Sequence, residues 1–330
     1  MQRIFIALSL LILLLSSCSE LERKEARGYT QGTTYSVIYY NNGADLQYQI
    51  DSLLLSFDRV LSTYQETSYI SKWNRNEQVP MGQPAEFKEV VKKASEIYDS
   101  SEGAFDITVS PLMKYWFEQD WNTVSIDSVF VDSLQASTGM ANVVLEGDDY
   151  VKLLPSIQLD VNAIAQGYSV DVVSRYLESE GIFNYLVEIG GEIRASGTKP
   201  NQELWSIGID KPSAENVERQ QSMSITVQDK ALATSGNYRK FVEIDGQRFG
   251  HSLNPVTGYP AKTDVLSATV IANDCMTADA YATALMVMGY EESMNLLTKK
   301  QDLGAVLIYS EGSDIKTWVS SGIMESVVEN

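Results

Sequence analysis

The sequence is poor in cysteine, in histidine and in clustered basic residues. Its two cysteines, Cys18 and Cys275, are too few for a disulfide framework, and Cys275 stands among small and apolar residues typical of buried packing. The 25 Lys and Arg residues are outnumbered by 44 Asp and Glu residues, which gives a formal net charge of −19 over 330 residues. Because a phosphate backbone is bound by stripes of basic side chains, this composition argues against nucleic acid as a partner.

The first residues have the pattern of an export signal. Arg3 precedes an apolar run from Ile4 to Leu15, which is too short for an ordinary membrane span. The run ends in Leu15-Ser16-Ser17-Cys18, which resembles a bacterial lipobox. We therefore expect a signal peptide at residues 1–17, a lipidated Cys18 with a polar tether over residues 18–30, and an exported lipoprotein that faces the periplasm from a membrane. The alternative is an ordinary secreted protein with a free cysteine.

Residues 31–330 are expected to form one domain of mixed helices and strands. Apolar spacing predicts helices at residues 45–61, 85–99, 113–117, 277–288 and 291–298, and a strand that continues into a helix between residues 159 and 181. β-branched and aromatic runs predict strands at residues 31–40, 185–189, 205–209, 223–227, 231–238 and 265–271. Glycine-containing turns between apolar runs predict hairpins at residues 143–154, 241–249 and 307–319.

The only histidine lies in a loop that its composition makes rigid. The loop is Gly250-His251-Ser252-Leu253-Asn254-Pro255-Val256-Thr257-Gly258-Tyr259-Pro260, and its two prolines and two glycines exclude a regular helix. A lone histidine in such a loop can act as a base, a phosphate contact or a metal ligand. It can equally be an ordinary loop residue, and the loop alone does not separate these alternatives.

Asp279 and Thr283 form a candidate metal-binding pair. They are four residues apart in the predicted helix 277–288, so they lie on one helical face, one above the other. A hard cation such as Mg²⁺ takes such oxygen ligands, and it would allow an anionic ligand to bind an acidic protein. The plainer explanation is that the helix dipole favours an Asp in the first turn.

Three further features are typical of anion or ring binding. The pairs Gly190-Gly191 and Ser235-Gly236 follow predicted strands, where glycine allows the backbone to approach a ligand. The segment from Asp160 to Gly167 enters a helix, whose first amides can meet an anion. Tyr64 lies in a polar loop and can stack on a flat ring. Ordinary turns, helix caps and cover for the core are the alternatives.

Taken in order, the motifs resemble one family, the ApbE family of FAD:protein FMN transferases. The resemblance extends from Gln31 to about Gly289. It rests on Gly32-Thr33-Thr34-Tyr35, Ser62-Thr63-Tyr64 with Ser68, Gly103-Ala104-Phe105-Asp106-Ile107-Thr108-Val109, Leu159-Asp160 through Gly167-Tyr168, Gly190-Gly191-Glu192-Ile193, Ala233-Thr234-Ser235-Gly236-Asn237-Tyr238, the histidine loop, and Ala278-Asp279-Ala280-Tyr281-Ala282-Thr283-Ala284-Leu285.

The resemblance implies a two-lobed, T-fold-related α+β architecture over residues 31–330, with antiparallel sheets flanked by helices and FAD in the cleft between the lobes. It implies Mg²⁺ on the FAD pyrophosphate, held by Asp279, Thr283 and the backbone carbonyl of Ala165. His251 and Asp279 are the implied catalytic residues. The implied FAD contacts are Tyr64, Asp106, Asp160, Gly191, Ser235, Gly236 and His251.

The implied reaction is phosphoryl transfer. The FMN moiety of FAD passes to a Thr or Ser hydroxyl of an exported redox protein domain, and AMP leaves, which requires positioning and charge neutralisation more than a strong nucleophile. The implied partners are acceptor domains of membrane redox complexes, either Na⁺-translocating NADH:quinone reductase or an Rnf-type complex. Two alternatives stay open: an FAD pyrophosphatase that yields FMN and AMP, and a flavin-binding lipoprotein without catalysis.

The chain departs from the family pattern at several positions, including Asn162 and Ala163, where the family often has glycines. Gln31 stands where the family often has Met, and Gln166 stands where it often has Lys. In the histidine loop, Gly250, Asn254 and Val256 replace a common His, Asp and Arg. These changes bear on FAD affinity, metal stoichiometry and acceptor choice, but they leave the Asp279 and Thr283 pair intact.

Overall fold

The computed structural model describes residues 21–79, 82–118, 126–210, 221–236, 241–244, 247–250 and 252–329. The predicted signal peptide, the predicted lipidation site Cys18 and the loop histidine His251 lie outside these residues. No helix within the described ranges is long and apolar enough to span a membrane.

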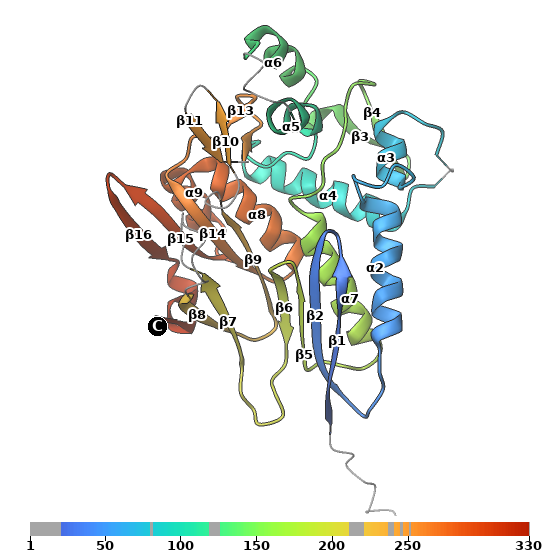
Figure 1. Cartoon of the computed structure of the whole chain (residues 1–330), viewed down its shortest axis with the longest axis vertical. Coiled ribbons are helices and arrows are strands. Elements are labelled where there is room, and N and C mark those ends of the chain that lie inside the picture. The colour runs from blue at the N-terminus through green and yellow to red at the C-terminus, as the bar shows by residue number, and fades with distance from the viewer. Residues whose placement is uncertain are drawn as a thin grey trace, which may run out of the picture.

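Antiparallel pairing builds the largest sheet (Figure 1). Among the described residues it has eight strands in the order β1-β2-β5-β6-β9-β14-β15-β16, and neighbouring strands run antiparallel. The strands are β1 (Glu22–Thr30), β2 (Thr33–Asn41), β5 (Tyr185–Ile189), β6 (Glu192–Ser196), β9 (Lys230–Gly236), β14 (Val265–Ala272), β15 (Gly304–Glu311) and β16 (Asp314–Val319). Together with the helices, this sheet confirms the expected α+β class.

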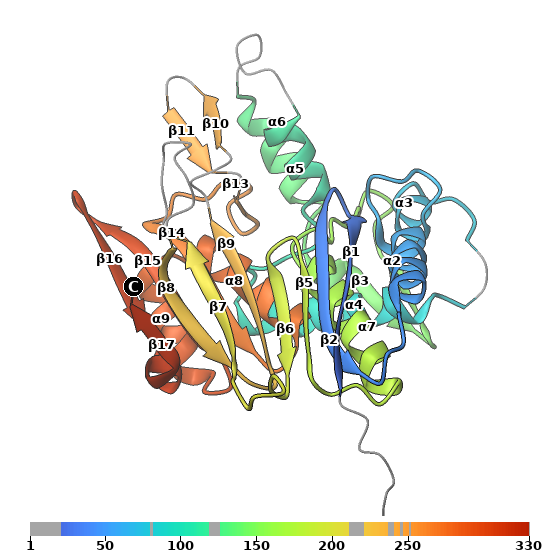
Figure 2. The same cartoon turned by 60° about the horizontal axis from the view of Figure 1, so that its bottom comes forward.

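A smaller sheet covers one face of the large one (Figure 2). Its strand order is β17-β8-β7, with β17 at Val327–Glu329, β8 at Gln221–Val227 and β7 at Trp205–Asp210. Short hairpins pair β3 (Val143–Glu146) with β4 (Asp149–Lys152), β10 (Phe241–Ile244) with β11 (Gln247–Gly250), and β12 (Leu253–Asn254) with β13 (Tyr259–Pro260). The first two hairpins confirm the predictions made from turn residues.

Helices cover the opposite face of the large sheet (Figure 1). Leu232 of β9 packs toward the small sheet, whereas the next residue, Ala233, packs into the cluster that contains α8, because successive strand residues point to opposite faces. The helices are α2 (Gln47–Leu61), α3 (Tyr69–Asn74), α4 (Ala85–Ser100), α5 (Ser110–Phe117), α6 (Ser128–Gln135), α7 (Ala165–Ser179), α8 (Cys275–Met288) and α9 (Tyr290–Lys299). Almost every residue of α8 is buried, so α8 is a core helix.

The segment expected to be a tether up to residue 30 is a strand from Glu22, which corrects the predicted boundary. β1 pairs with β2 along its whole length, from Glu22 opposite Asn41 to Thr30 opposite Thr33. Its charged residues are compatible with an edge strand because one side of such a strand faces water. Arg23 and Arg27 both pair with Glu25, and Ala26 is buried.

Three helices, α3, α5 and α6, differ from the sequence prediction, and α3 was not predicted. α5 begins at Ser110, three residues before the predicted helix 113–117. It includes Pro111, because a proline fits the first helical turn, where its missing N–H would have no partner. α6 was not predicted, since Val131 is the only buried residue in it and one buried position leaves no helical periodicity to read.

Candidate active site

The crossing of α7 and α8 places Asp279 in the protein interior. Asp279 is only 6% exposed. Its Oδ2 accepts a hydrogen bond of 3.0 Å from the backbone N–H of Gly167 in the first turn of α7. Burial raises the pKa of Asp279 from 3.8 to about 7, although the Gly167 amide acts in the opposite direction. A cation bound beside this carboxyl would therefore stabilise the carboxylate form.

Gly167 makes this close approach possible. A Cβ at position 167 would collide with the carbonyl oxygen of Cys275 and lie 2.8 Å from the Cβ of Asp279. Without a side chain at this position, α7 packs directly against α8 and its amide reaches the carboxylate. The sequence prediction treated Gly167 only as part of a helix start, and its contact with Asp279 was not foreseen.

Gly167→Ala is expected to lower the free energy of unfolding by about 1–3 kcal/mol, because the added methyl overpacks the helix crossing. The same displacement breaks the bond from the Gly167 amide to Asp279, so any activity that depends on Asp279 is expected to fall at least about ten-fold. Chemical denaturation and an activity assay measure both effects. Gly322→Ala is the control, since a Cβ there meets nothing within 4 Å. Wild-type stability in Gly167→Ala would contradict the packing described.

Thr283 lies one turn beyond Asp279 on α8 and meets the end of β9. Thr283 Oγ1 and Ser235 Oγ share a hydrogen bond of 3.3 Å, and Gly236 follows Ser235 as the last residue of β9. Ala165, 8% exposed, is the first residue of α7, two residues before Gly167. The structure therefore brings together the predicted metal ligands Asp279 and Thr283, the start of α7 with Ala165, and the predicted contact Ser235.

A second buried carboxylate, Glu192, lies beside Asp279. Glu192 is 8% exposed and opens β6 directly after the Gly190-Gly191 turn. Among the described residues, its Oε2 has no hydrogen-bond partner. Burial raises the pKa of Glu192 well above its usual value, and the charge of Asp279 raises it further. The sequence analysis included Glu192 in a motif but did not predict a role for it. The signal that could have found it is a carboxylate placed between two glycines and an apolar residue.

The oxygen donors at this place fit a hard divalent cation. Within the described part of the chain, no three His, Cys, Asp or Glu side chains are grouped so as to hold a metal ion. The predicted donors are instead the carboxylate of Asp279, the hydroxyl of Thr283 and the carbonyl of Ala165, which is the oxygen chemistry that Mg²⁺ takes. The unpartnered Glu192 Oε2 beside these donors supports the fit, because a nearby cation would compensate a buried carboxylate oxygen that no hydrogen bond stabilises.

The Tyr64 loop meets the segment that leads into α7. Tyr64 is 83% exposed, and Asn162 Nδ2 donates a hydrogen bond of 3.4 Å to its hydroxyl. Thr63 Oγ1 donates a hydrogen bond to Asn162 Oδ1 at 3.4 Å. The backbone N–H of Asn162 donates to Asp160 Oδ1 at 2.9 Å. Burial raises the pKa of Asp160. An exposed ring anchored by its hydroxyl is suited to stacking on a flat ligand, as the sequence predicted for Tyr64.

The Gly190-Gly191 turn directly precedes Glu192 and positions it at the start of β6. Gly190 has φ of +67° and Gly191 has φ of +116°, a region that favours glycine. A Cβ at Gly190 would collide with the side-chain amide of Gln166, and the Gly191 amide donates to Glu188 Oε1 at 2.9 Å. The exposed Gly191 backbone is accessible to a ligand, and the contact with FAD stays a prediction.

Asp106 has a different environment from the other predicted contacts. It is 6% exposed, and its Oδ1 accepts hydrogen bonds from the Thr108 amide at 2.7 Å and the Thr108 hydroxyl at 2.6 Å. The Thr108 hydroxyl in turn accepts from the Gly139 amide at 2.6 Å. These contacts hold two loops together, so the structure assigns Asp106 a structural role, while its contact with FAD stays a prediction.

Asp106→Asn is expected to change how stability depends on pH. Burial raises the pKa of Asp106 from 3.8 to about 6, so the folded protein binds this proton more tightly than the unfolded chain does. Its contribution to stability therefore falls as the pH rises from about 4 to about 6. Over that interval, the stability of Asp106→Asn relative to wild type should rise by up to about 3 kcal/mol. Chemical denaturation at each pH measures the free energy of unfolding. The control is Asp132→Asn at an exposed site, for which this free energy should vary with pH as in wild type. The same variation in Asp106→Asn as in wild type would refute the prediction.

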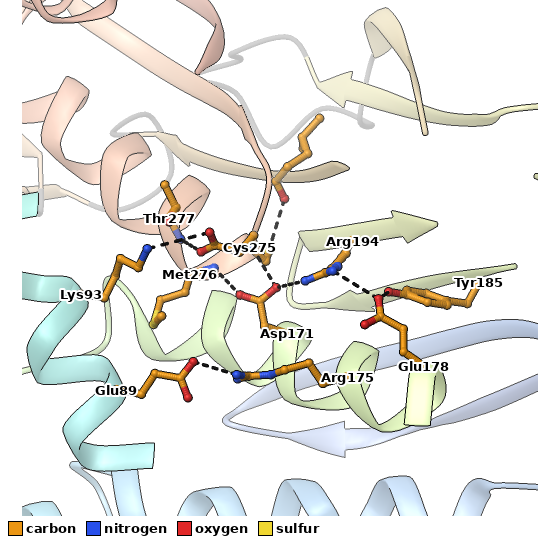
Figure 3. A network of polar contacts seen from close by, with 12 residues as sticks. Glu89, Lys93, Asp171, Arg175, Glu178, Tyr185, Arg194, Cys275, Met276 and Thr277 are labelled. Atoms are coloured by element: carbon orange, nitrogen blue, oxygen red, sulfur yellow. Dashed lines mark hydrogen bonds and ion pairs between the residues drawn. The ribbon is translucent and has the colours of Figure 1, made fainter. Parts of the chain in front are cut away.

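A buried polar network fixes the N-terminus of α8 (Figure 3). Asp171 of α7 accepts hydrogen bonds from the backbone amides of Cys275 at 2.9 Å and Met276 at 2.8 Å. Its Oδ1 also pairs with Arg194 of β6 at 3.1 Å, and Arg194 reaches Glu178 at 3.2 Å. The network joins α7, α8 and the sheet, so it sets the position of the helix that carries Asp279 and Thr283.

A surface pocket of about 310 Å³ lies away from these residues. Its lining includes Tyr40 and Asn41 at the end of β2 and Glu180 directly after α7, whereas the predicted ligand Ala165 lies at the opposite end of α7. None of the predicted site residues lines it, so this pocket is separate from the site around Asp279.

Sequence comparison finds relatives over almost the whole chain. The ApbE family matches residues 31–307. An FAD:protein FMN transferase from Vibrio cholerae serotype O1 is 37% identical over 330 residues, which cover 97% of this chain and 98% of the relative. The FAD:protein FMN transferase of Escherichia coli K12 is 31% identical over 304 residues, which cover 89% of this chain and 86% of the relative.

Solved structures of related proteins have the same fold. The flavin transferase ApbE from Vibrio cholerae superposes with a TM-score of 0.83 at 37% identity, covering 93% of this chain and 99% of that one. The ApbE protein from Thermotoga maritima superposes with a TM-score of 0.79 at 26% identity, covering 92% of this chain and 99% of that one.

Proposed function

The chain belongs to the ApbE family, and we propose that it is a Mg²⁺-dependent enzyme that transfers the FMN moiety of FAD to a Thr or Ser hydroxyl of an exported protein domain. The observation that supports this most directly is that Asp279 contacts the start of α7 through the Gly167 amide, while Thr283, one turn further along α8, contacts Ser235. Relatives named FAD:protein FMN transferase cover nearly all of this chain, which supports the same reaction.

The reaction exchanges one phosphate oxygen for another. The acceptor hydroxyl oxygen bonds to the FMN-side phosphorus of FAD, the bond from that phosphorus to the bridging oxygen breaks, and AMP leaves with that oxygen. The hydroxyl proton passes to a base, for which the family resemblance implies His251. Because the transfer needs aligned reactants more than a strong nucleophile, the fixed donors of this site suit it.

The chain's own groups would orient the diphosphate. The hydroxyls of Ser235 and Thr283 offer donors toward phosphate oxygens. In the first turn of α7, the amides of Ala165, Gly167 and Tyr168 already donate to groups of the protein, so the helix start would act mainly through its dipole. Asp279, Thr283 and the Ala165 carbonyl would hold Mg²⁺, which when bound neutralises diphosphate charge and activates the phosphorus as a Lewis acid. Tyr64, exposed and anchored by Asn162, would stack on the flavin ring.

The cellular setting is part of the proposal. The signal-like residues 1–17 and the lipobox-like Cys18 support an exported lipoprotein that faces the periplasm. Described residues begin at Leu21 and β1 begins at Glu22, so a lipidated Cys18 would leave only a very short link between the membrane surface and the sheet. The proposed acceptors are domains of membrane redox complexes, of the Na⁺-translocating NADH:quinone reductase or Rnf type.

One incubation tests the proposed activity. The purified protein is mixed with FAD, Mg²⁺ and an acceptor domain, and the acceptor is denatured and inspected for flavin fluorescence. Covalent fluorescence supports transfer. Release of FMN and AMP without a labelled acceptor would show an FAD pyrophosphatase instead, and unchanged bound FAD would show a flavin-binding protein without catalysis. Omission of Mg²⁺ is expected to remove the labelling.

A further inference from the structure

Glu192 is a buried carboxylate that the proposed chemistry does not yet use. It begins β6, and on this strand Glu192 and Arg194 point to the same face because they are two residues apart. Arg194 pairs with Asp171 and Glu178 of α7, so that face looks toward α7 and α8. Glu192 therefore points into the same layer between sheet and helices in which Asp279 lies.

No cation of the chain compensates Glu192 among the described residues. The Arg194 guanidinium, the nearest basic group along β6, is engaged by Asp171 at 3.1 Å and Glu178 at 3.2 Å. None of the described ion pairs includes Glu192, and Gln166, which packs against the preceding turn at Gly190, is uncharged. The Oε2 atom also lacks a hydrogen-bond donor.

Two buried carboxylates without a counter-charge repel one another. Glu192 and Asp279 are close enough for the charge of one to act on the other, and Asp279 receives one amide donor, from Gly167. Burying one such charge is costly, and burying two side by side is costlier unless a positive partner is present. A protein cation is not available in the described structure, and a divalent cation would satisfy both groups at once.

We propose that Glu192 is an additional oxygen ligand of the divalent cation held by Asp279 and Thr283, so that the metal site contains two carboxylates. This inference rests on the proposed function for the identity of the cation. Two carboxylates would raise the affinity for the cation in the absence of nucleotide, because affinity increases with the number of charged ligands. They would also leave the site neutral when a divalent cation is bound.

Metal binding in the absence of FAD tests this proposal. Isothermal titration of Mg²⁺ into the metal-free protein, together with the rise in thermal midpoint that Mg²⁺ produces, is measured for wild type and Glu192→Gln. The variant is expected to raise the Kd for Mg²⁺ by about 10- to 100-fold. Without Mg²⁺, its thermal midpoint is expected to equal or exceed that of wild type, because a neutral amide replaces a buried carboxyl whose Oε2 has no hydrogen-bond partner among the described residues. A residue with a merely structural role would not change the response to metal.

Glu188→Gln is the matched control. Glu188 lies in the neighbouring strand β5 and is not a proposed ligand; its charge acts on Glu192, and its Oε1 accepts a hydrogen bond of 2.9 Å from the Gly191 amide, which a glutamine can still accept. Its removal should change the Kd for Mg²⁺ by less than about two-fold. Should Glu192→Gln fail to fold, Glu192→Asp keeps the charge but withdraws the carboxylate by one methylene, and it is also expected to bind Mg²⁺ more weakly.

The outcomes separate this inference from the proposed function. Wild-type Mg²⁺ affinity in the Glu192 variants, with lost affinity in Asp279→Asn, would overturn the role of Glu192 and leave the metal at Asp279. Wild-type affinity in both, or no binding to the wild-type protein, would overturn the two-carboxylate site altogether. In that case FMN transfer to an acceptor, measured separately, would still decide the proposed activity.

Discussion

Asp279→Ala is expected to reduce FMN transfer by about a thousand-fold or more, to the limit of detection. The substitution removes the one carboxylate of α8, which is buried at the helix crossing and held by the Gly167 amide. Loss of a metal that neutralises transferred phosphate raises the barrier by several kcal/mol, which corresponds to this factor. Flavin fluorescence on the denatured acceptor, followed over time with FAD and Mg²⁺, measures the rate.

The control for this variant is the aspartate that precedes and caps the same helix. Asp274 caps α8 by accepting a hydrogen bond of 2.8 Å from the Thr277 amide. Asp274→Ala should therefore cost about 1 kcal/mol of stability but leave the transfer rate within a few-fold of wild type. Full activity in Asp279→Ala, with the protein folded by circular dichroism, would refute the assignment of Asp279 as a metal ligand.

Asp171→Ala is expected to have the largest effect on stability, lowering the free energy of unfolding by about 3–5 kcal/mol. The substitution removes the acceptor for two backbone amides at the start of α8 and one of the two partners of Arg194, all in a buried setting. Because Asp279 and Thr283 follow on the same helix, the loosened N-terminus should also weaken the rise in thermal midpoint produced by Mg²⁺. Urea unfolding with and without Mg²⁺ measures both.

Glu178→Gln is the control, because it changes only the more exposed of the two carboxylates that pair with Arg194. The Glu178 side chain is 31% exposed, and a glutamine can still accept the hydrogen bond that the Tyr185 hydroxyl donates at 2.6 Å. Loss of its charge should therefore cost less than about 1 kcal/mol. A change of similarly small size in Asp171→Ala would show that the cap of α8 does not depend on Asp171.

Local patterns in the sequence predicted much of the fold because they report local physics. The apolar spacing over residues 45–61 and 85–99 corresponds closely to α2 and α4, and the hairpin over residues 143–154 corresponds to β3 and β4. The pairing of β1 with β2 was missed because the charges of Glu22 to Arg27 are typical of a tether when the partner strand is not considered. α6 was missed for lack of an apolar repeat.

In the candidate site, too, the sequence predicted what lies within one helix and missed the contacts between distant segments. The spacing of Asp279 and Thr283 was sufficient to place them on one helical face, because both lie within two turns of α8. The approach of Tyr64 to Asn162, of Ser235 to Thr283 and of the Gly167 amide to Asp279 joins residues far apart in the chain. Such contacts depend on which helices and strands pack together, and no local pattern encodes that choice.

The sequence by itself determined the family, the acidic character and the list of residues able to bind a diphosphate and a metal. Only the tertiary structure showed that Glu192 is buried beside Asp279, with no hydrogen-bond partner for its Oε2 in the described part of the chain, and that Asp106 is held by Thr108. The physical reason is that burial and unsatisfied charge depend on the atoms that surround a group in space. A carboxylate has the same place in a motif whether it faces water or another buried carboxylate.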